Sequence, residues 1–128
     1  MPLIPLKSQS QSHVLPDPAS DYRAAHRVCQ YRIGREAIYF PAFPGDRYLP
    51  YSAVDKVLSR PASMPLKGCC GKALPMVRLR MYYDDGAFYQ DFMFEKLKQA
   101  DEALDALLAA RPEVHVMERA TSFANVIV

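Results

Sequence analysis

Apolar and polar residues alternate in two segments that meet at Asp84-Asp85-Gly86. Alternation with a period of two is typical of β-strands that bury one face. A two-residue loop at Asp85-Gly86, where both residues tolerate positive φ, gives a hairpin with one apolar face. Its cross-strand apolar pairs are Tyr83 with Phe88, Leu79 with Phe92, and Val77 with Phe94. This register also sets Arg80 opposite Asp91, a pair that an Asp84-Asp85 loop would lose, so we prefer it.

The spacing of apolar residues changes to three and four between Glu95 and Arg111, which predicts a helix with one buried stripe. Pro112 ends this helix because proline lacks an amide hydrogen and restricts the residue before it. We expect the helix to lie on the hairpin with these residues buried: Leu97, Ala100, Ala103, Leu104, Leu107 and Leu108. The charged residues Lys98, Asp101, Glu102 and Asp105 fall on the solvated side.

Upstream of the hairpin, Ala37-Ile38-Tyr39-Phe40 predicts a short strand that ends in the turn-forming segment Pro41 to Asp46. The alternation from Arg47 to Arg60 predicts a second long strand, in which Pro50 marks an edge or a bulge. Residues 61–74 are predicted to form a loop or a short irregular strand, because they hold two prolines and Gly68-Cys69-Cys70-Gly71.

Periodicity leaves residues 21–33 open between two structures. Ser20 can cap a short helix that begins at Asp21, but the same residues also alternate as a strand would. Residues 1–19 are rich in proline, serine and glutamine and predict an extended or mobile arm. We therefore expect a single domain over 20–118, followed by a tail over 119–128 whose apolar end could pack on a sheet edge or a partner.

The size and composition fit this organisation: 128 residues, half of them apolar, suffice for one core. The formal charge of +2 is too small to argue for nucleic acid as a partner. The odd cysteine count (Cys29, Cys69, Cys70), together with the lack of a signal-like segment, predicts a cytoplasmic location. No apolar run has the length of a membrane span, so integral insertion is not expected.

In their order, these segments resemble the bacterial pleckstrin-homology-like domains, including the GRAM-type branch. The resemblance covers residues 36–112 and rests on Ala37–Phe40, Arg47–Val57, Tyr82–Gly86, Phe92–Glu95 and Ala100–Leu104. It implies a mostly β fold with α: a bent antiparallel sheet or barrel with two nearly orthogonal halves, capped by the C-terminal helix.

No combination of residues specifies a reaction. Cys69-Cys70 lacks two further soft ligands at a recognisable spacing, so neither a metal nor a cofactor is expected. The pair Asp84-Asp85 suits a turn rather than acid–base chemistry. An enzyme would require His26 or His115 in a closed cleft beside a cysteine or a carboxylate.

Aromatic residues are dense around the first turn and suggest a protein- or peptide-binding surface, with the chain itself as a possible partner. The candidate residues are Tyr39, Phe43, Arg47, Tyr48 and Tyr51, although packing of alternate members in the core is the competing interpretation. We expect a non-catalytic binding or self-assembly domain.

The alternative function is peripheral binding to anionic lipid headgroups. Between Lys56 and Tyr83 the chain has six basic residues and no acidic one: Lys56, Arg60, Lys67, Lys72, Arg78 and Arg80. Such a segment can create a local positive potential. The competing interpretation is a solvated strand face whose acids, Asp91 and Glu95, come from the neighbouring strand.

Overall fold

A computed structural model of the chain describes residues 6–42, 45–65 and 73–120. The described part of the chain is mostly β, with two α-helices, the longer of which follows the β7–β8 hairpin. In order, the elements are β1 (Lys7–Ser8), α1 (Pro18–Ala24), β2 (His26–Val28), β3 (Tyr31–Ile33), β4 (Ala37–Phe40), β5 (Arg47–Pro50), a 3-10 turn η1 (Tyr51–Ala53), β6 (Val54–Pro65), β7 (Ala73–Tyr83), β8 (Phe88–Phe94), α2 (Leu97–Ala110) and β9 (His115–Glu118).

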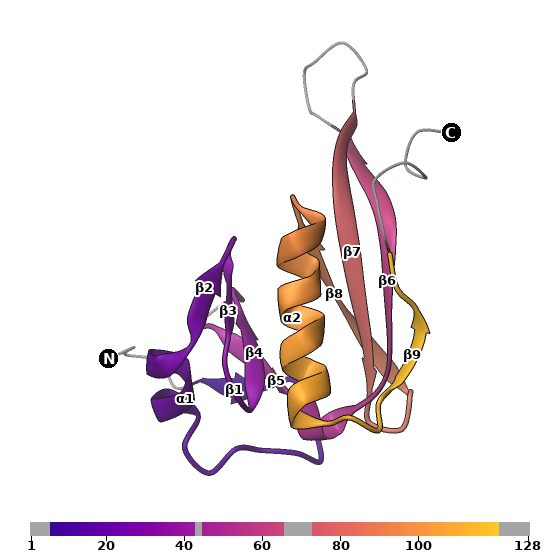
Figure 1. Cartoon of the computed structure of the whole chain (residues 1–128). Helices are drawn as coiled ribbons and strands as arrows, with labels where there is room; N and C mark the ends of the chain where they lie inside the picture. The colour runs from indigo at the N-terminus through magenta and orange to yellow at the C-terminus, as the bar shows by residue number, and fades with distance from the viewer. Residues whose placement is uncertain (1–5, 43–44, 66–72, 121–128) are drawn as a thin grey trace.

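The strands form two sheets. The first has the order β1-β5-β4-β3-β2 and the second β8-β7-β6-β9. Neighbours are antiparallel except for β1 on β5 and β9 on β6, which are parallel. Figure 1 shows α2 between the two sheets and the long β6–β7 hairpin extending beyond one end of α2. The main core therefore draws on both sheets and on α2.

The hairpin of β7 and β8 has the register that the sequence predicts. Tyr83 pairs with Phe88, and Arg80 pairs with Asp91. Asp85 and Gly86 have φ of 59° and 77°, and the amide of Ala87 donates to the carbonyl of Asp84. Positive φ at both central residues is what a type I′ turn requires, which explains the choice of Asp-Gly.

The C-terminal helix is also confirmed, with the predicted phase. Ala100, Ala103, Leu104 and Leu107 are buried, whereas Leu97 and Leu108 are half-buried. The stripe packs in the same cluster as Phe92 and Phe94 of β8. Among the described residues, no helix has both the length and the apolar character that crossing a membrane demands.

The prediction of one strand from Arg47 to Arg60 is wrong. The chain forms β5, turns through η1, whose N-cap is Pro50, and then enters β6 in the other sheet. Pro50 has φ −66° and can end a strand without loss of a ladder donor. The expected loop over 61–74 is also too long, because β6 continues to Pro65 and β7 starts at Ala73. Residues 66–72, including Cys69-Cys70, lie outside the described residues.

Residues 21–33 contain both of the structures that the sequence left open. The helix α1 begins at Pro18, and Asp17, not Ser20, is its cap, accepting from the amide of Ser20 at 3.2 Å. Strands β2 and β3 then form a tight hairpin in which Cys29 has φ 56°. Cysteine seldom adopts positive φ, so the sequence carries no signal for this turn.

Residues 6–17 form what we call the N-terminal strap, which joins the two sheets. Its strand β1 lies on the edge of β5, and the amide of Gln9 donates to the carbonyl of Tyr48 at 2.7 Å. Its next residues bind Asp84 at the β7–β8 turn: Ser10 Oγ at 2.5 Å, the Gln11 amide at 3.0 Å and Ser12 Oγ at 3.1 Å. At the other end of the chain, residues 121–128 of the predicted apolar tail lie outside the described residues.

We expect Leu104→Ala to lower the free energy of unfolding by about 2–5 kcal/mol, because it removes buried surface and leaves a cavity. Asp105→Ala, one residue along the helix, loses only an exposed contact with Arg119 and should cost less than about 1 kcal/mol. Denaturant unfolding of both variants measures the contrast. Equal, small losses would contradict the packing of α2 between the sheets.

The strap should loosen in acid. Partial burial disfavours the charged form of Asp84, but the hydrogen bonds from Ser10, Gln11 and Ser12 outweigh it and hold its pKa below the ordinary 3.8. Ionised Asp84 therefore stabilises the folded chain above pH 3.8, and this contribution is lost as pH falls through the lower folded pKa.

We therefore expect Asp84→Asn to be less stable than the parent at neutral pH and the gap to close below about pH 4. Asn tolerates positive φ, so the turn itself is preserved. Urea unfolding from pH 2 to 7 gives the profile, with Asp85→Asn as the matched control. A pH-independent gap would show that the carboxylate charge does not hold the strap.

Candidate functional site

The structure does not expose the aromatic surface that the sequence suggests around the first turn. Tyr39, Tyr48 and Tyr51 are each 1% exposed. Arg47 is half-buried, and its Nη1 donates to Gln9 Oε1 of the strap at 3.0 Å. Phe43 lies outside the described residues. The three tyrosines therefore cannot form an exposed binding surface, because the strap and α1 cover Tyr39 and Tyr48 while Tyr51 lies in the main core.

The tyrosine side chains instead hold the N-terminal part of the chain. Tyr39 and Tyr48 form a second apolar cluster with Ala37 on the outer face of the first sheet. The Tyr39 hydroxyl donates to Asp21 Oδ2 at 2.7 Å, and the Tyr48 hydroxyl accepts from the amide of Leu15 at 3.1 Å. Burial, followed by the bond to Asp21, raises the pKa of Tyr39 far above its ordinary value. The Tyr39 hydroxyl therefore stays protonated and holds Asp21 by a hydrogen bond.

The predicted basic residues are brought together where the structure describes them. Arg78 and Arg80 alternate with buried residues along β7, so they share the outer face of the second sheet. Arg60 pairs across to Arg78, and Lys56 to Tyr82. Lys67 and Lys72 lie outside the described residues. We call this surface the basic–aromatic face: Lys56, Arg60, Arg78, Arg80, Tyr82 and Tyr89.

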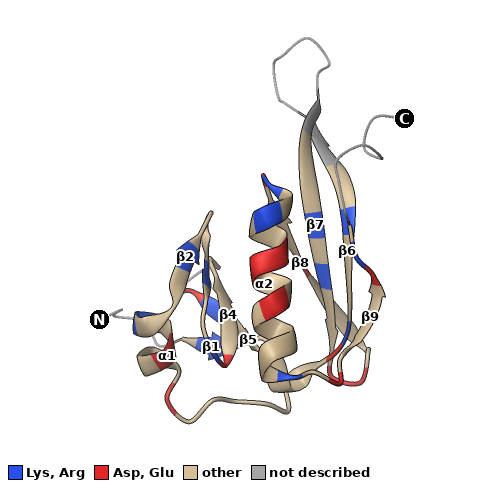
Figure 2. Ribbon diagram, in the orientation of Figure 1, with Lys and Arg blue, Asp and Glu red and all other residues tan. Residues whose placement is uncertain are grey.

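Two carboxylates neutralise part of the basic–aromatic face. Arg80 binds Asp91 through two hydrogen bonds, of 2.7 Å from Nε and 3.0 Å from Nη2, which keep the pKa of Arg80 above its ordinary value. Arg60 Nε donates to Glu118 at 2.8 Å. Figure 2 marks basic positions on β6 and β7 and acidic ones on α2. Four cations against two carboxylates leave this face with a net positive charge.

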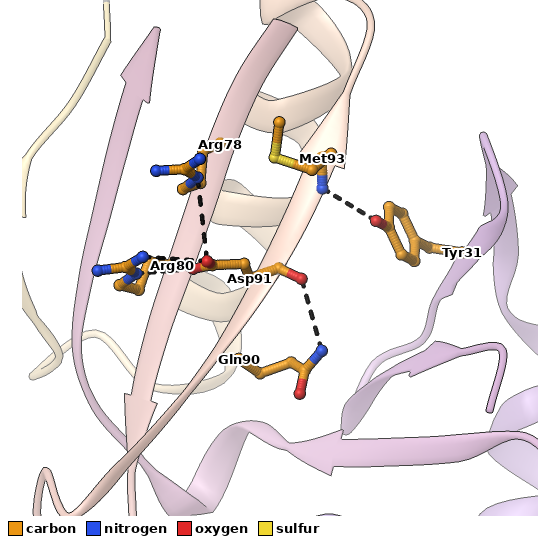
Figure 3. Close-up of polar contacts among 6 residues, drawn as sticks. All are labelled: Tyr31, Arg78, Arg80, Gln90, Asp91 and Met93. Carbon is orange, nitrogen blue, oxygen red and sulfur yellow. Dashed lines mark hydrogen bonds and ion pairs between the residues drawn. The ribbon is translucent and has the colours of Figure 1, made fainter. Parts of the chain in front are cut away.

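Of the three arginines of this face, Arg78 has the weakest contact with a carboxylate. Figure 3 shows it converging with Arg80 on Asp91, but its Nε lies 3.9 Å from Asp91 Oδ2, beyond hydrogen-bonding distance. This Nε is shielded from solvent and makes no hydrogen bond to the described residues. Since the side chain as a whole is 41% exposed, its other donors can reach an acceptor from outside.

Aromatic rings complete the face. Tyr89 is 53% exposed and lies opposite Tyr82, with ring centroids 5.9 Å apart. The guanidinium of Arg80 lies over the Tyr89 ring, 4.1 Å from its centroid. Bound to Asp91 and stacked on Tyr89, Arg80 holds the ring in a fixed orientation. The candidate residues predicted from the sequence do not include Tyr89, although alternation along this strand places it on the same face as Asp91 and the arginines.

The structure contains a second polar site that sequence reasoning missed. A cavity of about 250 Å³ on the outer side of the first sheet is lined by Tyr22, Arg27, Gln30, Arg32, Tyr39, Pro41 and Asp46. Arg27 and Arg32 are direct cross-strand partners on β2 and β3. The only signal in the sequence was their position on either side of a two-residue turn, and that turn could not be recognised at Cys29-Gln30.

The described residues offer little for catalysis. Imidazole Nε2 of His26 lies 3.6 Å from Glu102 Oε2, but both side chains are largely exposed, so no closed cleft surrounds them. No three histidine, cysteine or acidic residues of the described ranges gather where a metal could bind. Cys29 Sγ donates to Gln99 Oε1 of α2 at 3.2 Å and has a structural contact.

Comparisons with family models, with curated proteins and with solved structures found no match to this chain.

Proposed function

We propose that this chain is a non-catalytic binding domain of pleckstrin-homology-like architecture. Support comes from the succession of elements: the antiparallel strands β2 to β5, then the antiparallel strands β6 to β8, then a helix packed against the second set. The resemblance seen in the sequence implies two such halves closed by a C-terminal helix. The N-terminal strap, which includes β1, and the strand β9 are additions to this two-halved architecture.

The partner that best fits the basic–aromatic face is an acidic segment of another protein. The observation that carries this proposal is Tyr89, held half-exposed by Arg80 next to the incompletely bonded Arg78. Tyrosine and arginine are enriched at the centres of protein interfaces, where rigid rings give contact area at small entropic cost. A glutamate or aspartate of the partner would bind Arg78, and an apolar neighbour would pack on Tyr89.

The chain carries an acidic surface of its own, so a second copy is one possible source of such a segment. Glu102 and Asp105 lie on the exposed side of α2. A contact between α2 of one copy and the basic–aromatic face of another would be heterologous rather than two-fold. Sedimentation of the full chain alone separates self-association from capture of a different protein.

We expect a fluorescein-labelled peptide of alternating glutamate and phenylalanine to bind the full chain, and Arg78→Gln or Tyr89→Ala to weaken binding roughly tenfold. Fluorescence anisotropy at 50 and 300 mM salt measures both the affinity and its screening. Arg35→Gln, an exposed arginine elsewhere, is the matched control. Equal affinity for all four chains would overturn this assignment of the face.

The alternative function is contact of the same face with anionic lipid headgroups. Four basic side chains on one face of a sheet favour it, whereas pairing with Asp91 and Glu118 weighs against it. A planar surface of negative charge would attract all free cations of the face at once, with little need for the aromatic ring.

Vesicle co-sedimentation distinguishes the two partners. If lipid is the partner, the chain should bind phosphatidylserine vesicles more than phosphatidylcholine vesicles, and Lys56→Glu with Arg78→Glu should abolish the difference. Tyr89→Ala should then have little effect, in contrast to its effect on peptide binding. Equal retention on both vesicles would rule out headgroup binding, and so would insensitivity to the charge reversals.

A further inference from the structure

The cavity on the outer side of the first sheet holds two cations that form no ion pair with the described residues. Arg27 and Arg32 face each other across β2 and β3, a placement that destabilises an antiparallel pair. Neither guanidinium has a carboxylate within 4.0 Å among the described residues. Arg27 Nε makes one long contact, 3.5 Å, to the carbonyl of Cys29. Most guanidinium donors in this cavity therefore have no partner among the residues that the structure describes.

Aromatic packing fixes the position of one of these cations. The Arg32 guanidinium lies over the ring of Tyr22, 4.4 Å from its centroid. Tyr22 in turn packs edge-on against the buried ring of Tyr39, with centroids 5.2 Å apart. The stacking orients the planar fork of Arg32 without using its hydrogen-bond donors. A preorganised fork is the geometry that binds a carboxylate through two parallel bonds.

The same cavity also holds an anion. Asp46 accepts one hydrogen bond, from the hydroxyl of Tyr22 at 3.1 Å, and makes no ion pair with the described residues. Its remaining lone pairs accept from none of the described residues and can accept from a ligand. A doubly charged phosphate at the arginines would be repelled by this carboxylate, whereas a ligand that carries both charges would satisfy both ends of the cavity.

We propose that this cavity binds a small zwitterion of the amino-acid class. Its carboxylate lies between Arg27 and Arg32, and its ammonium group binds Asp46. The Gln30 side chain and Pro41 line the space left for the rest of the ligand. This cavity lies on the first sheet, whereas the basic–aromatic face lies on the second. Ligand binding in the cavity therefore does not depend on what the basic–aromatic face binds.

Calorimetric titration of the full chain with L-leucine, N-acetyl-L-leucine, 3-methylbutylamine and inorganic phosphate tests the charge pattern. We expect L-leucine to bind at least about tenfold tighter than the acetylated acid or the amine, each of which lacks one charge. Arg32→Gln should weaken L-leucine at least about tenfold, and Arg32→Lys less, because lysine keeps the charge but loses the fork. Arg23→Gln, an exposed arginine of α1 outside the cavity, is the matched control.

Asp46→Asn provides the decisive comparison, because it removes a charge but keeps a group that can bond Tyr22. It should erase the preference for L-leucine over N-acetyl-L-leucine and improve phosphate binding. Thermal unfolding of each variant shows that the fold is retained. If phosphate binds the unsubstituted chain as tightly as L-leucine, or if L-leucine does not bind, the zwitterion assignment is wrong.

Discussion

The contact of Phe92 with the first sheet is the interaction on which the rest of the structure depends. Phe92 belongs to β8, yet its ring packs edge-on against Tyr31 and Phe40, with centroids 5.3 and 5.6 Å away. Tyr31 also meets Phe94, at 5.2 Å. These rings place residues of both sheets and of α2 in one core. Without them each sheet would have to bury its apolar face separately, which few strands of this length can do.

Two aspartates add a polar frame to that core, each by accepting several hydrogen bonds. Asp84 fastens the strap to the β7–β8 turn, and Asp21 accepts from the amides of Arg35 and Glu36 and from the hydroxyl of Tyr39. The close approach of Asp21 explains Gly34, where a Cβ would collide with this carboxylate. The N-terminal residues thereby cover the aromatic face that the sequence had suggested for a partner. The N-terminal residues thus occupy the surface of Tyr39 and Tyr48 from within the same chain.

Local signals sufficed for the last third of the fold, because the Asp85-Gly86 turn and the apolar stripe of α2 each depend on residues close in sequence. Local signals failed where the chain passes from the first sheet to the second at η1. The alternation of apolar and polar residues continues through Tyr51, so no local pattern marks the change of sheet. The basic positions of β7 could be predicted from alternation, but the Arg27–Arg32 pair required a turn at Cys29, whose positive φ is atypical. Burial of Tyr39 and Tyr48 depends on the strap, which composition alone does not place.

The hydroxyl of Tyr31 also accepts a hydrogen bond from the amide of Met93 at 2.9 Å, visible in Figure 3. Strand β8 is the outermost strand of its sheet, and an edge amide of this kind is a template for another chain to extend the sheet. A side chain from the neighbouring sheet that occupies this donor interrupts the template near the C-terminal end of β8. At this end of β8 the phenol disfavours strand addition, while the ring of Tyr89 stays displayed on the outer face of the same strand.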